Sequence, residues 1–393
     1  MRSKPGGGLT KKVPPPRTAF RRFDPPLAGE GKKCGEEETT MARTFSRRDV
    51  LKASSALALT VPSASVLAAA PPASAITPEL IEAAKKEGKV VYYTSIDLSA
   101  AERIAKSFEA KFPGIPVRVE RSGAERVFQR IGQEYASRIF AVDVVNTSDA
   151  AHAIVWKANG WLAPYLPEDV AKHFPAEHKD SDGMFASVRV TLCPIAYNTS
   201  LVKADEAPKS FADLLDPKWA GKIVKAHPSY SGTILTATYQ VARDLGWSYF
   251  EKLAQQRIMQ VQSATDPPKK LALGERAIMA DGGEYVALAL KEKGDPIEIV
   301  YPAEGTPLIV GPNAIFQNAP NPNAARLLQS YMFSAEGQQV MIDSAGMHSV
   351  HALTKEKPGR KSLSQIKLMK DDAAAVERES ENIKKRYSQI FKV

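Results

Sequence analysis

Residues 90–112 read VVYYTSIDLSAAERIAKSFEAKF, and this stretch decides the fold class. Its first five residues are mostly β-branched or aromatic, which is typical of a buried strand. Ser99 and Glu102 stand three positions apart, the spacing of a helix-capping box, and apolar residues follow at helical intervals. The stretch therefore predicts a strand that leads directly into a helix.

The same order of signals recurs along the chain. The β-rich runs 117–121 and 141–145 are followed by helix-start signals at 122–125 and 147–148, and a second series begins with the run 222–226. Alternating strands and helices of this length favour parallel sheets with helices on both faces. We therefore expect an α/β protein with two modules.

Two N-terminal segments are expected to lie outside the fold. Residues 1–40 are rich in Pro, Gly and Lys without an apolar period, and we interpret them as a misassigned or disordered leader, with translation starting at Met41. Residues 41–75 combine the pair Arg47 and Arg48 with an apolar stretch and a small-residue cleavage site. They predict a twin-arginine-type signal peptide and a periplasmic protein. A chance arginine pair ahead of a membrane anchor is the alternative.

The composition argues against a nucleic-acid partner and against a cysteine-based metal site. The chain of 393 residues has a net charge of +9, but its first 75 residues hold 13 Lys and Arg against 6 Asp and Glu, which leaves 40 against 38 in the rest. A nearly neutral mature chain lacks the basic surface that a polyanion requires. Of the two cysteines only Cys193 remains after the predicted cleavage, so no intrachain disulfide or thiolate cage is expected.

Hydroxyl side chains and glycines follow the predicted strand ends. In open parallel sheets ligands bind at the carboxyl ends of the strands, and helix N-termini there present free N–H groups that suit an anion. Ordinary helix capping is the alternative explanation for each of these residues. The candidate ligand-binding residues of this kind are Thr94, Ser95, Ser122, Gly123, Ser148, Ser231, Gly232 and Thr233.

Six short segments follow one another along the chain: VYYTS (91–95), FEAKFPGI (108–115), VDVV (142–145), GWLAPY (160–165), AYNTS (196–200) and FADLLDPKWAGK (211–222). Together they resemble the ferric-ion-type periplasmic solute-binding proteins of ABC importers, over most of residues 88–350. The resemblance implies the type II two-lobed α/β fold, with a mainly parallel sheet flanked by helices in each lobe and hinge crossovers between the lobes. It also implies a small ligand bound between the lobes and delivered to a permease and an ATPase in the inner membrane.

The residue bounds of the two lobes follow from the places where the chain is expected to cross from one lobe to the other. The C-terminal segment has apolar residues at helical spacing among charges, which predicts an amphipathic helix packed on a lobe. We expect a monomer. The expected parts are a first lobe of residues 76–188 plus 306–350 and a second lobe of residues 189–305 plus 351–393.

The resemblance leaves the ligand open. Ferric-binding relatives hold iron through adjacent tyrosines, commonly with a His and a Glu, because Fe(III) prefers hard oxygen ligands. Here the tyrosine pair falls on Glu284 and Tyr285, so one of the two tyrosines is kept. The His position falls on or near Asp97, and the Glu position on Ser148 or Asp149. Tyr285, Glu284 and Asp97 are therefore the implied metal ligands if the solute is iron, and they also belong to the ligand-binding set for any other solute.

A small organic anion is the alternative to iron. The wider family includes receptors for phosphonates and sugar phosphates, and hydroxyl-lined helix ends suit such ligands. No resident cofactor is expected, and ferric iron enters only as a transported ligand.

A binding protein is favoured over an exported enzyme, which the twin-arginine route would also allow. The sequence has no zinc-protease spacing, no Gly-x-Ser-x-Gly elbow and no complete phosphate-binding loop. His348 and His351 have a spacing that a metal accepts, but a surface position near a lobe boundary is the simpler explanation. We therefore expect a transport receptor that catalyses no reaction.

Overall fold

The computed structural model describes residues 70–393 of the chain. The predicted leader and the arginine pair of the predicted signal peptide lie outside the described residues. In the part that is described, no helix is both long enough and apolar enough to cross a membrane.

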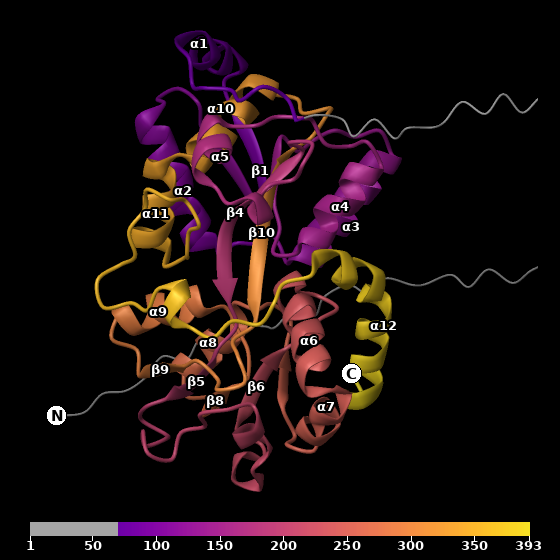
Figure 1. Ribbon diagram of the computed structural model, residues 1–393, viewed down its shortest axis with the longest axis vertical. Coiled ribbons are helices and arrows are strands. Elements are labelled where there is room, and N and C mark those ends of the chain that lie inside the picture. Colours follow the sequence, from indigo (N-terminus) through magenta and orange to yellow (C-terminus); the bar gives the residue numbers. More distant parts are fainter. Residues whose placement is uncertain (1–69) are drawn as a thin grey trace, which may run out of the picture. The chain divides into compact units, whose positions relative to one another are not determined.

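Residues 70–393 contain two five-stranded sheets (Figure 1). The strand order is β2-β1-β3-β10-β4 in the first sheet and β7-β6-β8-β5-β9 in the second. The first sheet consists of β1 (Val90–Thr94), β2 (Val117–Arg121), β3 (Val144–Asn146), β4 (Phe185–Leu192) and β10 (Leu308–Ile315). The second consists of β5 (Ile195–Asn198), β6 (Ile223–Ala226), β7 (Met259–Val261), β8 (Ile278–Met279) and β9 (Ile297–Val300).

Both sheets are mixed. β1 runs parallel to β2 and β3, whereas β10 runs antiparallel to β3 and β4. In the second sheet β6 is parallel to β7 and β8, and β5 is antiparallel to β8 and β9. The two-lobed α/β class with mainly parallel sheets is confirmed, because four strands of each sheet run in one direction and only β10 in the first sheet and β5 in the second run against them.

Helices pack around each sheet, and we call each sheet with its helices a lobe. The helices of the first lobe are α1 (Pro78–Glu87), α2 (Leu98–Lys111), α3 (Ala124–Ala136), α4 (Ala150–Ala158), α5 (Glu168–His173), α10 (Pro322–Phe333) and α11 (Ala335–Ala345). Those of the second lobe are α6 (Gly232–Leu245), α7 (Trp247–Ala254), α8 (Asp266–Ala272), α9 (Glu284–Glu292) and α12 (Ala373–Phe391).

Strand β1 shows how the first sheet is covered on both faces. Val90 and Tyr92 belong to a core that includes residues of α2 and α10, whereas Val91 and Tyr93 belong to a core that includes residues of α3 and α4. Successive side chains of a strand point to opposite faces, so a strand between two helix layers is apolar throughout. All five residues of β1 are buried, as the run 90–94 predicted.

The helix starts next to the site differ slightly from the sequence prediction. Asp97, and not Ser99, caps α2, because its carboxylate accepts a hydrogen bond from the Ser99 N–H at 3.1 Å. Gly123, and not Ser122, is the N-cap of α3, and no side chain among residues 70–393 caps that helix. The N-cap of α6 is Ser231, whose hydroxyl accepts from Ile234 N.

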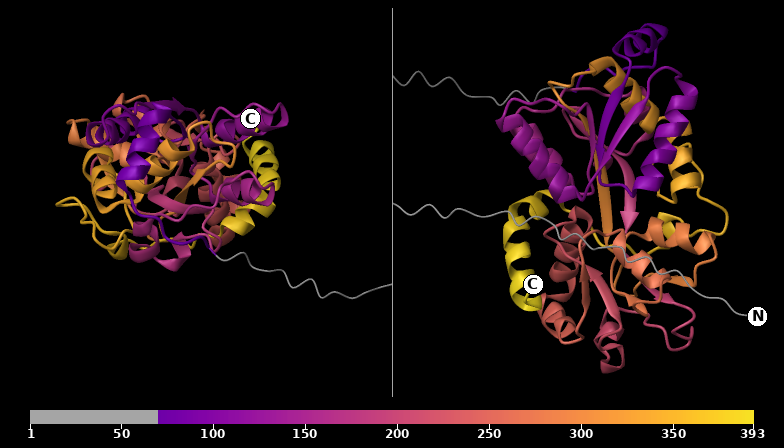
Figure 2. Two further views of the ribbon diagram at one scale, coloured as in Figure 1. Left: turned by 90° about the horizontal axis from the view of Figure 1, so that it is seen from above. Right: turned by 180° about the vertical axis from the view of Figure 1, so that it is seen from behind.

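Within residues 70–393 the chain passes between the two sheets three times. It leaves the first sheet after β4 through the fully buried Cys193, returns between β9 and β10, and runs through residues 346–372 to α12. The boundary expected after Val188 falls inside β4, because the ladder of β4 with β10 continues to Leu192. α12 packs along α6 and α7 and also contacts α4 of the first lobe (Figure 2).

Candidate functional site

A small cavity lies where the two lobes meet. The space not filled by atoms is about 280 Å³ and includes open solvent, whereas only about 10 Å³ admits the centre of a water-sized sphere, so the cavity is narrow. Its walls are residues from strand ends and helix starts, together with one residue from the middle of β4. The lining residues are Ser95, Gly123, Ala124, Ser148 and Arg189 from the first lobe, and Ser231, Thr233, Ser263, Ala264, Thr265 and Tyr285 from the second.

Six residues singled out from the sequence share this cavity: Ser95, Gly123, Ser148, Ser231, Thr233 and Tyr285. They come together because β1 and β3 run parallel and end at one edge of the first sheet, while α6 begins opposite them in the second lobe. The N–H of Thr233 donates a hydrogen bond to the Ser148 hydroxyl at 3.1 Å, which links the two lobes directly.

Three other expected residues adjoin the cavity without lining it. The Thr94 hydroxyl accepts a hydrogen bond from Ile96 N at 3.1 Å, and the Ser122 N–H donates to the Thr94 carbonyl. Gly232 packs against the first lobe beside the cavity. Thr94 and Ser122 therefore shape the backbone of the site, and their hydroxyls are not among the groups that face the cavity.

Two glycines allow the lobes to approach closely at this point. A Cβ on Gly123 would lie 2.6 Å from the carbonyl oxygen of Tyr230, and a Cβ on Gly232 would lie 2.7 Å from the Cβ of Asp149. Both separations are shorter than any van der Waals contact. Glycine is therefore required on each side for the helix starts to meet as they do.

Asp97 lies in a groove next to the cavity. Its carboxylate accepts a hydrogen bond from Lys269 at 2.7 Å and caps α2. The pKa of Asp97 is lowered, since burial raises it but the hydrogen bonds from Lys269 and Ser99 outweigh burial. Its backbone N–H donates to the Tyr285 hydroxyl at 2.9 Å.

Glu284 points into a different buried cluster and does not line the cavity. Its carboxylate accepts hydrogen bonds from His348 and from Arg360, each at 2.9 Å, and from the Tyr301 hydroxyl. His348 is fully buried, which contradicts the surface position expected for it, because its ring lies between Glu284 and Glu356. His351 is also buried and contacts an aspartate on α5.

Tyr285 is the one implied iron ligand that faces the cavity. Burial raises the pKa of its hydroxyl above the ordinary value, although nearby arginines lower it. The carboxylates of Asp97 and Glu284 are each held by a basic side chain and do not line the same wall. The three iron ligands inferred from the resemblance therefore lie apart: Tyr285 at the cavity, Asp97 in the neighbouring groove and Glu284 in the buried cluster with His348.

The sequence interpretation missed Arg189, which is the most informative residue of the cavity. Its side chain is only 2% exposed, and it donates hydrogen bonds to Asn146 Oδ1 at 3.1 Å and Thr191 Oγ1 at 2.6 Å, with Ser95 Oγ at 3.5 Å. No carboxylate of residues 70–393 forms an ion pair with it. Burial lowers the pKa of its guanidinium. One signal was available, since Arg189 is the only charged residue in β4.

Arg121 is a second arginine beside the cavity with neutral partners. It ends β2, and its guanidinium donates to Ser263 Oγ at 2.8 Å and to Thr265 Oγ1 at 3.3 Å in the second lobe. Ser263 and Thr265 were also missed, because β7 before them is only three half-buried residues long and has no clear strand pattern.

These groups make the cavity electropositive. The guanidinium of Arg189 and the N-termini of α3 and α6 line it, Arg121 lies beside it, and no Asp, Glu or His of the described chain lines it. Helix N-termini favour negative charge, and arginine forms paired hydrogen bonds with carboxylate and phosphate groups. The arrangement is suited to hold an anion.

Comparison with known proteins agrees with this architecture. The Synechocystis sp. protein named iron uptake protein A1 is 24% identical and aligns with 75% of this chain and 83% of its own length. A probable ABC transporter periplasmic-binding protein of Sinorhizobium fredii, y4fP, is 24% identical over 58% of this chain and 65% of its own length. The structure of the periplasmic binding protein AfuA from Actinobacillus pleuropneumoniae, with fructose-6-phosphate bound, is 25% identical, with a TM-score of 0.71 over 78% of this chain and 99% of its own.

The family is shown by a match over more than half of the chain. The model of the family described as bacterial extracellular solute-binding protein matches residues 150–369, which include Arg189, the start of α6 and Tyr285. With the two-lobed fold and the cavity between its lobes, this match identifies the chain as a bacterial extracellular solute-binding protein.

Proposed function

We propose that the protein is the periplasmic receptor of an ABC importer and that its solute is a small organic anion with a phosphoryl, phosphonyl or carboxylate group. Delivery to a membrane permease and its ATPase, export through the twin-arginine route and action as a monomer are parts of the same proposal. The observation that carries the choice of solute is Arg189, a buried guanidinium at the cavity whose partners within residues 70–393 are all neutral.

The energetics of burial explain why Arg189 points to an anion. A buried charge without a counter-charge is unfavourable, and an anion that enters the cavity would compensate it. A cation would meet repulsion from the same group. The bound fructose-6-phosphate in the AfuA structure supports a sugar phosphate as one member of the ligand class.

The chemistry of the walls supports binding over catalysis. The cavity residues of the described chain offer hydroxyls, backbone N–H groups and one guanidinium. General acid–base catalysis needs a group that titrates near the working pH, usually His or a carboxylate, within hydrogen-bond reach of the reacting atom. A receptor fits these walls better than an enzyme.

Ferric iron is the second candidate because Tyr285 lines the cavity and one relative is named an iron uptake protein. The two solutes make opposite demands on Arg189 and Tyr285. An anion depends on the guanidinium, whereas iron depends on the phenolate oxygen, which has to lose its proton.

Calorimetric titration of the mature protein tests the proposal. Sugar phosphates, phosphonates, small carboxylates and ferric citrate are compared on wild type, Arg189→Met and Tyr285→Phe. We expect an organic anion to bind wild type and Tyr285→Phe and to lose most of its affinity for Arg189→Met. A visible charge-transfer band with ferric citrate that disappears in Tyr285→Phe would show that the solute is iron and not an organic anion. Consumption of the bound compound, followed by NMR, would instead indicate an enzyme.

A further inference from the structure

A second polar cluster lies behind the cavity wall in the first lobe. It consists of Glu125 in the first turn of α3, Asp149 at the N-cap of α4 and His152 in the first turn of α4. Their side chains are almost fully buried, with residue exposures of 3%, 1% and 5%. None of the three lines the solute cavity, although the neighbouring residues Ala124 and Ser148 do.

The three side chains converge on one point. One ligand atom from each lies within 4.8 Å of the other two. His152 Nε2 is 3.0 Å from a Glu125 oxygen and 3.9 Å from Asp149 Oδ2. Ligand atoms about 2.0–2.2 Å from a tetrahedral zinc ion are themselves separated by little more than 3 Å, so small side-chain shifts are enough to place an ion between them.

An orphaned acceptor points into this cluster. Asp149 Oδ2 is buried and has no hydrogen-bond partner in the described chain, while its other oxygen caps α4 by accepting from Ala151 N at 2.9 Å. A buried polar atom without a partner is rare and unfavourable. The His152 ring is held in place by stacking on Phe128, with the ring centroids 4.5 Å apart. The unpaired oxygen and the fixed ring face each other.

The two carboxylates of the cluster have few basic partners in residues 70–393. Lys384 of α12 donates to Glu125 Oε2 at 2.8 Å, and this ammonium is the only basic side chain of the described residues in contact with either carboxylate besides His152. Glu125 and Asp149 therefore share one lysine and one imidazole. A divalent cation is a larger compensating charge than the proton that the imidazole binds.

We propose that Glu125, Asp149 and His152 form a binding site for one divalent transition-metal ion, with Zn²⁺ as the preferred ion. One imidazole nitrogen and two carboxylate oxygens are ligands that Zn²⁺ accepts in four-coordinate sites, with water as the fourth. Lys384 remains on the outer oxygen of Glu125 and orients that carboxylate, as outer partners do in other metal sites. The Lys384 side chain is 18% exposed and therefore leads from the buried cluster to solvent.

This site is separate from solute binding and does not depend on the identity of the solute. It shares no residue with the cavity, and it excludes Tyr285. Glu125 and Asp149 stand at the starts of α3 and α4, so a bound ion would tie together the two helix starts that form the first-lobe wall. Its expected role is to stabilise that wall.

The test uses the mature protein after treatment with EDTA. Zn²⁺ is titrated by calorimetry, and Co²⁺ serves as a spectroscopic probe because its visible absorption reports the coordination geometry. We expect one equivalent of Zn²⁺ to bind and to raise the Tm. Asp149→Asn, which keeps a capping oxygen, and His152→Asn should each weaken Zn²⁺ binding by at least about 10-fold.

The matched control is His351→Asn. His351 is also buried and lies 3.1 Å from Asp169, but no third ligand of the described chain joins that pair. The control should bind Zn²⁺ like wild type. Zinc binding absent at micromolar concentrations, or unchanged in His152→Asn, would overturn the proposal, as would loss of Zn²⁺ in Tyr285→Phe. If the variants fail to fold, zinc-edge anomalous diffraction from soaked wild-type crystals decides, since a peak away from Glu125, Asp149 and His152 refutes the site.

Discussion

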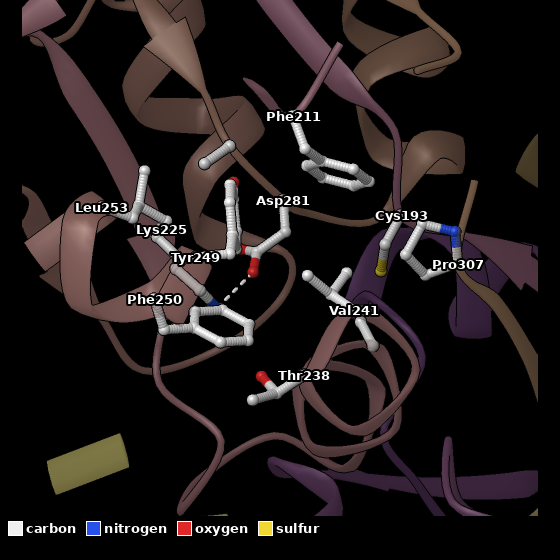
Figure 3. Close-up of a pocket in the computed structure, with 12 residues that line it drawn as sticks. Cys193, Phe211, Lys225, Thr238, Val241, Tyr249, Phe250, Leu253, Asp281 and Pro307 are labelled. Carbon is white, nitrogen blue, oxygen red and sulfur yellow. Dashed lines mark hydrogen bonds and ion pairs between the residues drawn. The ribbon is translucent and has the colours of Figure 1, made fainter. Parts of the chain in front are cut away.

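Two buried cations, Arg189 in the first lobe and Lys225 in the second, have the same exposure but different surroundings. Each is 2% exposed. Lys225 forms an ion pair with Asp281, as the dashed line in Figure 3 shows, and aromatic rings including those of Tyr249 and Phe250 surround the pair. Asp281 also accepts a hydrogen bond from Ala226 N at 3.1 Å. In the described part of the chain, the partners of Arg189 are hydroxyl and amide oxygens alone.

The difference indicates two roles. A buried cation with its own carboxylate is neutralised within the fold, so it contributes to structure and needs no ligand. A buried cation without one keeps an unbalanced charge that an external anion can neutralise. Burial of a charged residue therefore does not by itself indicate ligand binding. The presence or absence of a counter-charge among its partners is the better indicator.

The largest effect is expected from Lys225→Met. Removing one partner of a buried ion pair leaves Asp281 charged in an apolar cavity, and such changes reduce the free energy of unfolding by about 3–5 kcal/mol. Urea denaturation monitored by circular dichroism measures the loss. The double variant Lys225→Met with Asp281→Leu should recover most of it. Equal instability of the single and double variants would show that the pair is not the cause.

Arg189→Met should have the opposite profile. Solute affinity is expected to fall by about 2–5 kcal/mol, or roughly 30-fold or more, because a desolvated charge pair with the anion is lost. The stability of the unliganded protein should stay unchanged or rise, because an uncompensated buried charge is removed. Calorimetry and a thermal melt measure the two quantities. A strong loss of stability with intact solute binding would show that Arg189 has a structural role and not a binding role.

A smaller effect is expected from Gly123→Ala at the contact between the lobes. The new methyl group would lie 2.6 Å from the Tyr230 carbonyl oxygen, so the lobes have to separate there. Overpacking of this kind is unfavourable by about 1–3 kcal/mol, and we expect affinity for the solute to fall by roughly 5- to 150-fold. Gly132→Ala is the control, because a Cβ at Gly132 in the same helix meets nothing within 4 Å. Identical solute affinities of Gly123→Ala and Gly132→Ala would contradict the close approach of the two lobes at Gly123.

The smallest effect is a pH dependence of stability from His348. Burial lowers the pKa of its imidazole, but the hydrogen bonds to Glu284 and Glu356 outweigh burial and raise it. The stabilisation is therefore complete below the unfolded pKa of about 6.5 and is lost as the pH rises through the higher folded value. The Tm difference between wild type and His348→Asn should decrease as the pH is raised above 6.5. Arg360 keeps Glu284 paired in the variant, which limits the effect. A difference that grows with pH would show that His348 is buried neutral.

Much of the fold was predictable because local signals agreed with the tertiary structure. The run 90–94 predicted β1 correctly, since a strand between two helix layers has to be apolar on both faces. Helix α1 also begins at a local signal, since the Thr77 hydroxyl accepts a hydrogen bond from Leu80 N and Pro78 occupies the first turn. The short strand β7 gave no such signal, and the residues after it were missed. The antiparallel direction of β5 and β10 could not be predicted from the sequence either, because it depends on how the chain passes between the lobes, and no local pattern indicates that.

By itself, the sequence determined the α/β class, the two-module organisation and the hydroxyl-bearing strand ends, because periodicity and capping act over a few neighbouring residues. Only the tertiary structure decided which of those residues face one cavity. It placed Ser95, Ser148, Ser231 and Tyr285 together, moved Glu284 into another cluster and brought Arg189 to the site. The physical reason is that an electrostatic site depends on which charges remain unpaired after folding. Those pairings join residues about 50 to 260 positions apart, such as Lys225 with Asp281 and Lys384 with Glu125.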